Sequence, residues 1–276
     1  MRQQRLPWIP IIILGTIIFC AAAAPLITPY SPIKVDLLNR LVPPVWMEGG
    51  SPAHIIGTDS LGRDLLTRIF YGARISLMVA VFVLSVGGPL GLALGIIAGY
   101  KQGPLSAVIM RLVDGVLAVP GLLLALIFSM TLGSSMATVV IALSFHGWCR
   151  FARITRGEVL TLMTRDFVLQ ARIAGCSPLR IMLVHLVPNV LNAFMIMASL
   201  QIGQIILSEA TLSFLGAGIP PPTPSWGQIV SEGRGYMTSA WWIAFFPGLA
   251  LSFTVFAMNL AGDWVRDRLD PKLRQL

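Results

Sequence analysis

A strongly basic stretch lies between two runs of residues that are too apolar for water, and it limits the possible folds more than any other feature. This basic stretch, residues 150–189, holds the acidic residues Glu158 and Asp166 among a larger set of arginines: Arg150, Arg153, Arg156, Arg165, Arg172 and Arg180. So much charge is costly in hydrocarbon, and an excess of arginine marks the cytoplasmic side of a membrane. The pattern therefore predicts a cytoplasmic loop between two membrane spans.

Within the basic stretch, the residue types predict two short helices joined at a glycine. A helical pattern from about Arg165 runs to Gly175, and glycine tolerates the left-handed backbone that closes many helices. Ser177 offers an N-cap oxygen, and Pro178 takes the first helical position, where its missing N–H costs nothing. The second helix is expected to end at Pro188. We call residues 174–178 the glycine elbow.

The composition places the whole chain in a membrane. It is 55% hydrophobic and only 12% charged, whereas a soluble domain carries about 25% charge. The net charge of +8 is typical of nucleic-acid binders, but here lysine and arginine cluster at the ends of apolar runs, as membrane topology requires. Cys20, Cys149 and Cys176 form no C-x-x-C pair, so neither a disulfide framework nor a zinc site is supported.

The apolar runs predict six membrane spans with both termini inside. We expect them at about residues 6–27, 75–98, 110–131, 136–148 and 190–207, and from the tryptophan pair 241–242 to about 261. Pro120 would kink the third span, and glycines such as Gly91 would let the second span approach a neighbour closely. A cleaved signal peptide is the alternative for the first run, which exceeds the 7–15 apolar residues typical of that signal.

The placement of lysine and arginine tests this topology. On the predicted inner side lie the arginines of the basic stretch together with Arg2, Arg5, Lys101, Arg111, Arg266, Arg268, Lys272 and Arg274. On the predicted outer side lie fewer, namely Lys34, Arg40, Arg63, Arg68, Arg74 and Arg234. Most of the outer residues belong to one long external segment, where the charge bias counts less.

The predicted organisation has four parts. Residues 1–28 form an N-terminal transmembrane helix, 29–72 a periplasmic segment, 73–264 a transmembrane core that contains the basic stretch, and 265–276 a cytoplasmic tail. In the periplasmic segment, helical spacing from Asp64 predicts an amphipathic helix at the membrane interface, with an Asp64–Arg68 pair. His54, Asp59 and Asp64 could bind a metal, but we favour capping and interface anchoring, because nothing else nearby completes a site.

Polar residues inside or beside the later spans are candidates for function. Gln201, Gln204 and Ser208 lie on one face of the fifth span, where they would either line a substrate channel or bond to a neighbouring helix. The proline-rich outer segment, residues 216–240, contains Trp226, an aromatic suited to a partner surface or to a simple interfacial anchor.

The residues indicate no enzyme. His54, His146 and His185 are far apart, with no H-E-x-x-H and no serine nucleophile elbow. A phosphate-binding P-loop needs Gly-Lys before Ser or Thr, but the lysines of this chain follow isoleucine, tyrosine and proline. If ATP drives transport, another polypeptide must hydrolyse it, and the basic stretch would receive the force by docking as a helix in a groove. An ordinary amphipathic connector on the inner leaflet is the alternative.

The basic stretch resembles the "EAA" loop of bacterial ABC-importer permeases, E-A-A-x₃-G-x₉-I-x-L-P. Ala171, Gly175 and Pro188 match this pattern, while it departs at Leu169, Gln170, His185 and Val187. A second string resembles the family at His54, Gly57, Thr58, Asp59, Gly62, Arg63, Asp64, Thr67, Arg68, Tyr71, Gly72, Arg74, Ser76 and Leu77. Residues 221–227 also match, as do Pro247, Gly248, Asn259, Leu260, Gly262, Asp263, Arg266, Asp267, Leu269, Asp270 and Pro271. The chain thus resembles the second permease subunit of the dipeptide/oligopeptide/nickel ABC importers.

The resemblance implies an all-α, six-span integral membrane fold of the type I ABC-importer (MetI-like) class with a cytoplasmic coupling helix. It implies that the ATPases are contacted by Arg165, Asp166, Ala171, Arg172, Gly175, Cys176, Ser177 and Pro178. A binding protein would dock near Asp59, Arg63, Pro221 and Trp226. The implied partners are a related permease, two ATPases that hold ATP and magnesium, and an external solute-binding protein, at a bacterial inner membrane.

The implied function is import of di- or oligopeptides by alternating access, with nickel, glutathione or haem as alternative cargo of the same fold. An ion-coupled secondary carrier would need ionisable residues at mid-span, whereas Asp114, Glu209 and Asp263 lie near predicted span ends. A membrane scaffold without a transport role would not need polar residues in the fifth span.

Overall fold

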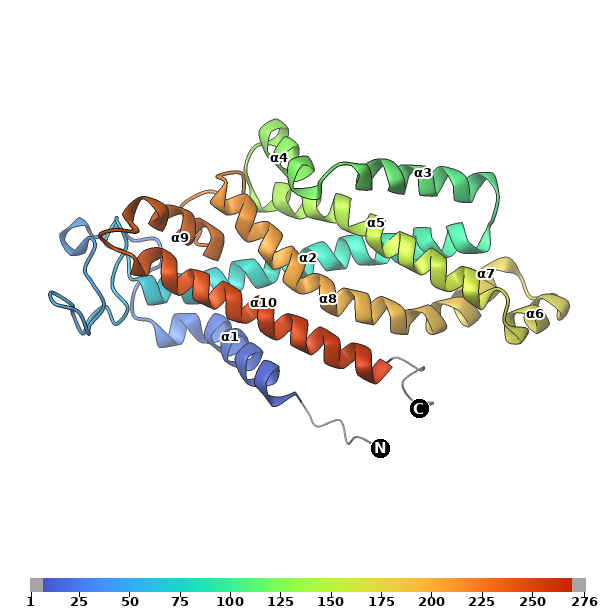
Figure 1. Cartoon of the computed structure of the whole chain (residues 1–276), viewed down its shortest axis with the longest axis horizontal. Helices are drawn as coiled ribbons and strands as arrows, with labels where there is room; N and C mark the ends of the chain where they lie inside the picture. The colour runs from blue at the N-terminus through green and yellow to red at the C-terminus, as the bar shows by residue number, and fades with distance from the viewer. Residues whose placement is uncertain (1–6, 270–276) are drawn as a thin grey trace. The chain divides into compact units, whose positions relative to one another are not determined.

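Long apolar runs become long helices because a helix satisfies its own backbone groups where no water is available. The structure is a computed structural model that describes residues 7–269, so the predicted inner charges Arg2, Arg5, Lys272 and Arg274 and the matched Asp270 and Pro271 lie outside the described residues. The elements, drawn in Figure 1, are α1 (Trp8–Ile27), η1 (Leu37–Asn39), α2 (Leu65–Tyr100), α3 (Pro104–Ala118), α4 (Gly121–Leu132), α5 (Met136–Leu162), α6 (Asp166–Ile173), α7 (Pro178–Arg180), η2 (Ile181–Leu186), α8 (Val187–Phe214), α9 (Trp226–Gly233), η3 (Arg234–Tyr236) and α10 (Trp242–Leu269).

Four helices of the described chain are long and apolar enough to cross a membrane, and a fifth span is possible if a bent pair counts as one. The four are α1, α2, the continuous helix Pro178–Phe214 and α10, and the bent pair is α3 with α4. Helix α5 covers the predicted fourth span, but it carries Arg150, Arg153 and Arg156 and fails this test of composition. The predicted all-α membrane fold is confirmed, whereas length and composition alone do not reproduce the count of six spans.

The predicted kink at Pro120 is a complete break. Helices α3 and α4 meet at an angle of 85°. Val119 has an extended backbone (φ −92°, ψ 129°), because a proline disfavours helical geometry in the residue before it. The third predicted span is therefore a broken span or a re-entrant segment.

The predicted interfacial helix before the second span does not exist as a separate element. Helix α2 is one helix of 36 residues that begins at Leu65. Leu65, Ile69 and Ala73 lie at helical spacing on its apolar face, but this face is buried inside the protein instead of lying on a bilayer. Arg68 is also fully buried, because its charge is matched by other parts of the chain.

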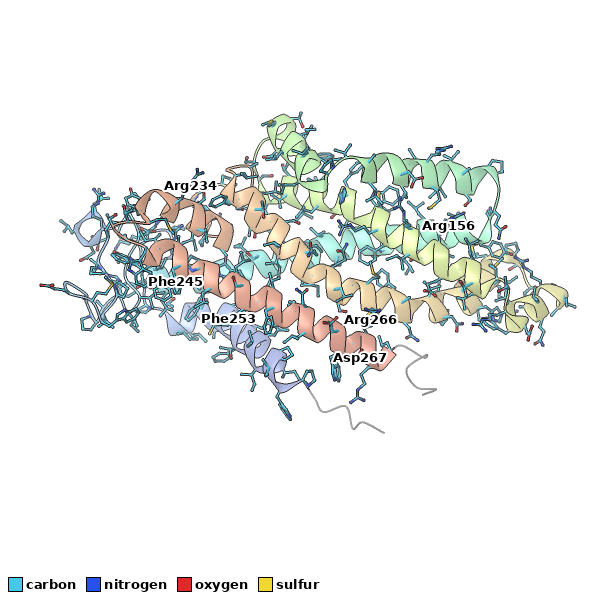
Figure 2. The ribbon with its side chains drawn as sticks, in the orientation of Figure 1. Arg156, Arg234, Phe245, Phe253, Arg266 and Asp267 are labelled. Atoms are coloured by element: carbon cyan, nitrogen blue, oxygen red, sulfur yellow. The ribbon has the colours of Figure 1, made fainter. Side chains whose placement is uncertain are left out.

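Contacts group the chain into two compact units, and several long helices contribute one part to each. Of the described residues, unit 1 comprises 7–81, 125–139 and 202–261, and unit 2 comprises 82–124, 140–201 and 262–269. The largest buried side chains of unit 1 include Leu65, Trp226, Ile229 and Ile243. On the outer face of α10, Phe245 and Phe253 are about half exposed, as expected where lipid or a partner supplies the surroundings (Figure 2).

In unit 2, a glycine stripe brings α2 against α5, as the sequence predicts. A Cβ atom built on Gly91 would lie 2.4 Å from the Trp148 carbonyl oxygen, and one on Gly95 would lie 2.7 Å from the Ala152 carbonyl oxygen. Only glycine allows this approach, because any side chain at these positions would collide with α5.

Candidate functional site

The first half of the glycine elbow is a complete helix-ending motif. Helix α6 has Asp166 in its first turn and Arg172 in its last, the charge order that complements the helix dipole. The Gly175 N–H donates to the Arg172 carbonyl oxygen at 3.0 Å, and the Cys176 N–H donates to the Ala171 carbonyl oxygen at 3.0 Å. Together with a φ of +75° at Gly175, these bonds form a Schellman motif, as predicted.

The second half of the elbow starts the next helix as expected, but that helix does not end where the sequence predicts. The Ser177 hydroxyl accepts a bond from the Arg180 N–H at 3.4 Å, and Pro178 occupies the first helical turn. The helix then passes Pro188, contrary to the prediction, and continues to Phe214. A wide π-helical turn at Ile181–Leu186 precedes the proline, because a residue without an N–H can be accommodated where the regular bonding ladder is already interrupted.

Only the middle of the basic stretch is a loop, so the predicted loop of residues 150–189 is too long. Helix α5 continues to Leu162, because its arginines find polar partners on other helices of unit 2. Arg153 pairs with Asp114 of α3 at 2.5 Å. Arg156, labelled in Figure 2, donates to the Ser106 hydroxyl of α3 at 3.1 Å.

Around the elbow, one side is tied to unit 2 and the other is exposed. Val168, Ala171, Ile181 and Leu186 are buried in one cluster with residues of α2 and α5, and Cys176 packs against it. The exposed side carries Arg165, Asp166, Arg172, Gly175, Ser177 and Pro178. It also presents two apolar side chains, Ile173 at 87% and Leu179 at 61% exposure. Ala171 and Cys176 thus support the elbow from inside, while the other predicted coupling residues are exposed, although the Arg172 guanidinium also contacts the Met163 sulfur and the Tyr100 ring.

Gln201, Gln204 and Ser208, the candidates for lining a substrate channel, have three different environments. Gln201 is buried, and its Oε1 accepts a bond of 3.4 Å from Arg150 Nη1 of α5, so the oxygen of this amide contacts a neighbouring helix. Gln204 is exposed, and the Ser208 hydroxyl donates to the Gln204 carbonyl oxygen of its own helix at 2.7 Å. For Gln204 and Ser208, the channel assignment stays a prediction.

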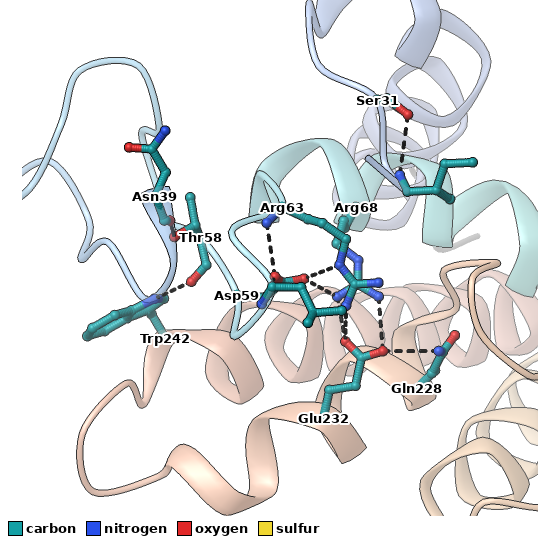
Figure 3. A network of polar contacts seen from close by, with 11 residues as sticks. Ser31, Asn39, Thr58, Asp59, Arg63, Arg68, Gln228, Glu232 and Trp242 are labelled. Atoms are coloured by element: carbon teal, nitrogen blue, oxygen red, sulfur yellow. Dashed lines mark hydrogen bonds and ion pairs between the residues drawn. The ribbon is translucent and has the colours of Figure 1, made fainter. Parts of the chain in front are cut away.

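A buried network of charges in unit 1 joins the segment before α2 to α9. This outer charge cluster consists of Asp59, Arg63, Arg68 and Glu232, whose side chains point toward one another in Figure 3. Arg68 Nη1 lies 2.5 Å from Asp59 Oδ2 and 2.6 Å from Glu232 Oε2. Arg63 reaches the same two carboxylates at 2.7 and 2.8 Å. Two cations thus balance two anions, which is what makes their burial tolerable.

Asp64 has a different role from the predicted ion pair with Arg68. Its carboxylate accepts bonds from the Thr67 N–H at 2.8 Å and the Thr67 hydroxyl at 2.7 Å, and it lies 3.0 Å from the His54 ring nitrogen. The preferred expectation of capping is confirmed for this residue, since the Thr67 bonds satisfy donors of the first turn of α2.

Three of the four residues predicted to dock a binding protein have side chains that are buried within this chain, which does not favour a docking role for them. Asp59 and Arg63 belong to the outer charge cluster. Trp226 is 1% exposed, and its Nε1–H donates to the Ile69 carbonyl oxygen at 3.0 Å, so it holds α9 against α2. Pro221 is exposed and remains a predicted docking residue.

Sequence reasoning missed two carboxylates that join distant segments. Glu232 completes the outer charge cluster from α9. Glu209, which was expected near a span end, is fully buried in α8 and accepts bonds from Ser76 at 2.9 Å and Ser213 at 2.8 Å. Neither carries a local signal, although an acidic residue within an apolar run is itself a sign that the fold supplies partners.

Comparisons with known proteins agree with this architecture. Residues 91–275 match the family described as "Binding-protein-dependent transport system inner membrane component". The Di/tripeptide transport system permease protein DppC of Pseudomonas aeruginosa is 42% identical over 94% of this chain and 85% of its own length. The Dipeptide transport system permease protein DppC of Escherichia coli K12 is 44% identical over 94% of this chain and 86% of its own length.

Solved structures show the same fold at low sequence identity. A chain of the MetNI methionine ABC transporter in an inward-facing conformation superposes with a TM-score of 0.58 at 17% identity, covering 75% of this chain and 96% of that one. A chain of an amino acid ABC transporter crystallised with histidines gives a TM-score of 0.53, covering 76% of this chain and 94% of that one. The predicted MetI-like fold class is thereby confirmed.

Proposed function

The chain belongs to the family of binding-protein-dependent transport system inner membrane components, and from that premise we propose that it is a permease subunit of an ATP-driven importer of short peptides. The peptide cargo is supported by relatives that are named dipeptide or di/tripeptide permeases at 42–44% identity over nearly the whole chain. It is a multi-pass protein of the inner membrane, with several helices apolar enough to cross it.

The observation that carries the proposal is the glycine elbow. A short helix is held to unit 2 by buried apolar residues, while Ile173, Leu179 and several charged groups remain exposed beside a rigid Schellman turn. An exposed apolar pair surrounded by charge has the composition of a protein-binding surface. We assign this surface to contact with an ATPase subunit, with Arg165, Asp166, Arg172, Gly175, Ser177 and Pro178 at or beside the contact.

The remaining partners follow from the same role. A second, homologous permease would complete the path as a heterodimer, two ABC ATPases would bind ATP and magnesium, and an external binding protein would deliver the peptide near Pro221. Both termini would lie in the cytoplasm, which places the glycine elbow on the ATPase side and α9 on the outer side.

Transport would then proceed by alternating access. Closure of the ATPases on ATP pulls on the glycine elbow, and the elbow transmits the movement to α8, because Pro178–Phe214 is one continuous helix. Such coupling needs two arrangements of the permease that ATP and peptide bias differently.

The test is uptake of a labelled dipeptide by the complete importer in proteoliposomes. We expect uptake that requires ATP, both ATPases, the second permease and the binding protein. Uptake that continues without ATP and follows an imposed ion gradient would instead identify an ion-coupled carrier. Supplying nickel or glutathione in place of the dipeptide distinguishes the alternative cargoes of the same fold.

A further inference from the structure

Arg150 is an arginine of α5 that lacks an acidic partner. Among the residues that the structure describes, its side chain makes one hydrogen bond, of 3.4 Å from Nη1 to Gln201 Oε1, near the long limit for such a bond. By contrast, Arg153, one turn further along α5, has the Asp114 carboxylate at 2.5 Å. Among residues 7–269, no carboxylate lies within ion-pair distance of Arg150.

The lengths of two separate helices place this pair inside the apolar layer. Arg150 lies about 21 Å along α5 from its first residue, Met136, at 1.5 Å per residue. Gln201 lies about 20 Å along α8 from its last residue, Phe214. In the proposed orientation both of these ends are external. Both helices therefore put the pair roughly two-thirds of the way from the external to the cytoplasmic side of a hydrocarbon core about 30 Å thick.

Arg150 and Gln201 carry N–H groups that have no hydrogen-bond acceptor in the described part of the chain. The exposed Arg150 guanidinium uses one N–H weakly, and the Gln201 amide nitrogen has no acceptor in the described part of the chain. One turn before Arg150, the His146 Nδ1 atom is buried without a hydrogen-bond partner. An uncompensated cation at this depth is expensive, and such residues commonly mark the route of a substrate.

We propose that Arg150, assisted by the Gln201 amide, binds the C-terminal carboxylate of the peptide as it crosses the membrane, an inference that rests on the proposed function. A guanidinium can hold a carboxylate through two parallel N–H bonds, which are stronger than bonds between neutral groups. Every unmodified short peptide carries this carboxylate whatever its side chains are. Arg150 therefore recognises a group that all such peptides share and does not distinguish between peptides with different side chains.

The experiment compares two forms of one dipeptide, the free acid and the C-terminal amide, in proteoliposomes that hold the complete importer. Uptake of both is measured at saturating binding protein for the wild type, Arg150→Gln and Arg150→Lys. The ratio of acid to amide uptake is then compared between variants, so the preference of the unchanged binding protein cancels. Arg111→Gln is the matched control, because Arg111 is an exposed arginine of α3 without an ion pair in the described chain.

We expect Arg150→Gln to lower the acid-to-amide ratio about tenfold or more, the size of a lost charged hydrogen bond. Arg150→Lys should keep most of the ratio, and Arg111→Gln should keep all of it.

An unchanged ratio in Arg150→Gln overturns the inference, and so does an equal loss for acid and amide, which would indicate pairing with a second permease or a lipid phosphate. If Arg150→Gln does not assemble, Gln201→Leu is measured instead, and an unchanged ratio there overturns the inference equally. A wild type without ATP-dependent uptake contradicts the proposed function itself.

Discussion

Arg68 and Glu232 are 164 residues apart in the chain, yet Arg68 Nη1 lies 2.6 Å from a carboxylate oxygen of Glu232. Arg68 is fully buried at the start of α2, and Glu232 lies near the end of α9. Through this contact and those of Asp59 and Arg63, α9 is attached to the first turns of a membrane span (Figure 3).

Replacing Arg68 with alanine should destabilise unit 1 strongly. The change leaves Asp59 and Glu232 with one cation between them, and breaking a buried ion pair in this way costs about 3–5 kcal/mol. Thermal unfolding of the purified complex measures the loss. Arg40→Ala is the control, because Arg40 is an exposed arginine of the segment between α1 and α2. Equal melting temperatures for the two variants would contradict the stabilising role of the outer charge cluster.

Gly175→Val should uncouple ATP hydrolysis from uptake while the complex still assembles. No atom lies within 4 Å of a Cβ placed at Gly175, so the substitution causes no collision. It does strain the left-handed backbone (φ +75°) by about 1–2 kcal/mol, which corresponds to a 5–30-fold change in an equilibrium. ATPase and uptake rates are measured together. Gly175→Asn is the control, since asparagine tolerates this backbone, and equal uptake by both variants would contradict the role of the turn.

Ile173→Glu should weaken attachment of the ATPases without unfolding the permease. The side chain is 87% exposed, so its loss removes little internal packing, whereas a buried charge in a protein contact typically costs more than 1 kcal/mol. Co-purification of the ATPases should fall about tenfold. Leu38→Glu, at a site that is 96% exposed in the external segment, should leave co-purification unchanged. Full retention of the ATPases by Ile173→Glu would exclude this residue from the contact.

Gly91→Ala should force α2 and α5 apart. The added methyl group would lie 2.4 Å from the Trp148 carbonyl oxygen and 2.5 Å from the Phe151 Cβ atom, and overpacking of this kind costs about 1–3 kcal/mol. Gly115→Ala in α3 meets nothing within 4 Å, so it should be neutral or slightly stabilising. Melting temperatures of the two variants check the difference, and a neutral Gly91→Ala would contradict the close packing of the two helices.

Trp226→Phe should lower stability without affecting the binding protein. The change leaves the buried Ile69 carbonyl oxygen without the Nε1–H donor, at a cost of about 1–3 kcal/mol. Affinity of the reconstituted importer for its binding protein should stay as in the wild type, because the ring is buried. Pro221→Ala, at an exposed site, is the comparison for docking. A folded Trp226→Phe complex that fails to bind the binding protein would instead support the predicted docking role of this residue.

The two helix ends at the glycine elbow could be predicted from the sequence, because capping acts within a few residues. Gly175, Ser177 and Pro178 each determine the backbone of their own turn, so their order along the chain is enough. The glycines of α2 were equally informative, since a stripe of small residues on an apolar helix has few other uses.

Contacts between distant segments escaped prediction. The arginines of α5 predict the end of a span, but Asp114 and Ser106 of α3 allow that helix to continue. Likewise, Trp226 was expected at a surface, although the Ile69 carbonyl oxygen 157 residues away holds it inside.

The amino-acid sequence by itself determined the membrane class, the helices, the elbow and the family resemblance. These depend on local composition and on the spacing of a few residues, which need no tertiary context. Only the tertiary structure decided which charges are buried together, how sharply the third predicted span bends at Pro120 and that Arg150 has no acidic partner in the described chain. The reason is that the free energy of a buried polar group depends on partners brought from other parts of the chain, and spacing along one segment does not identify them.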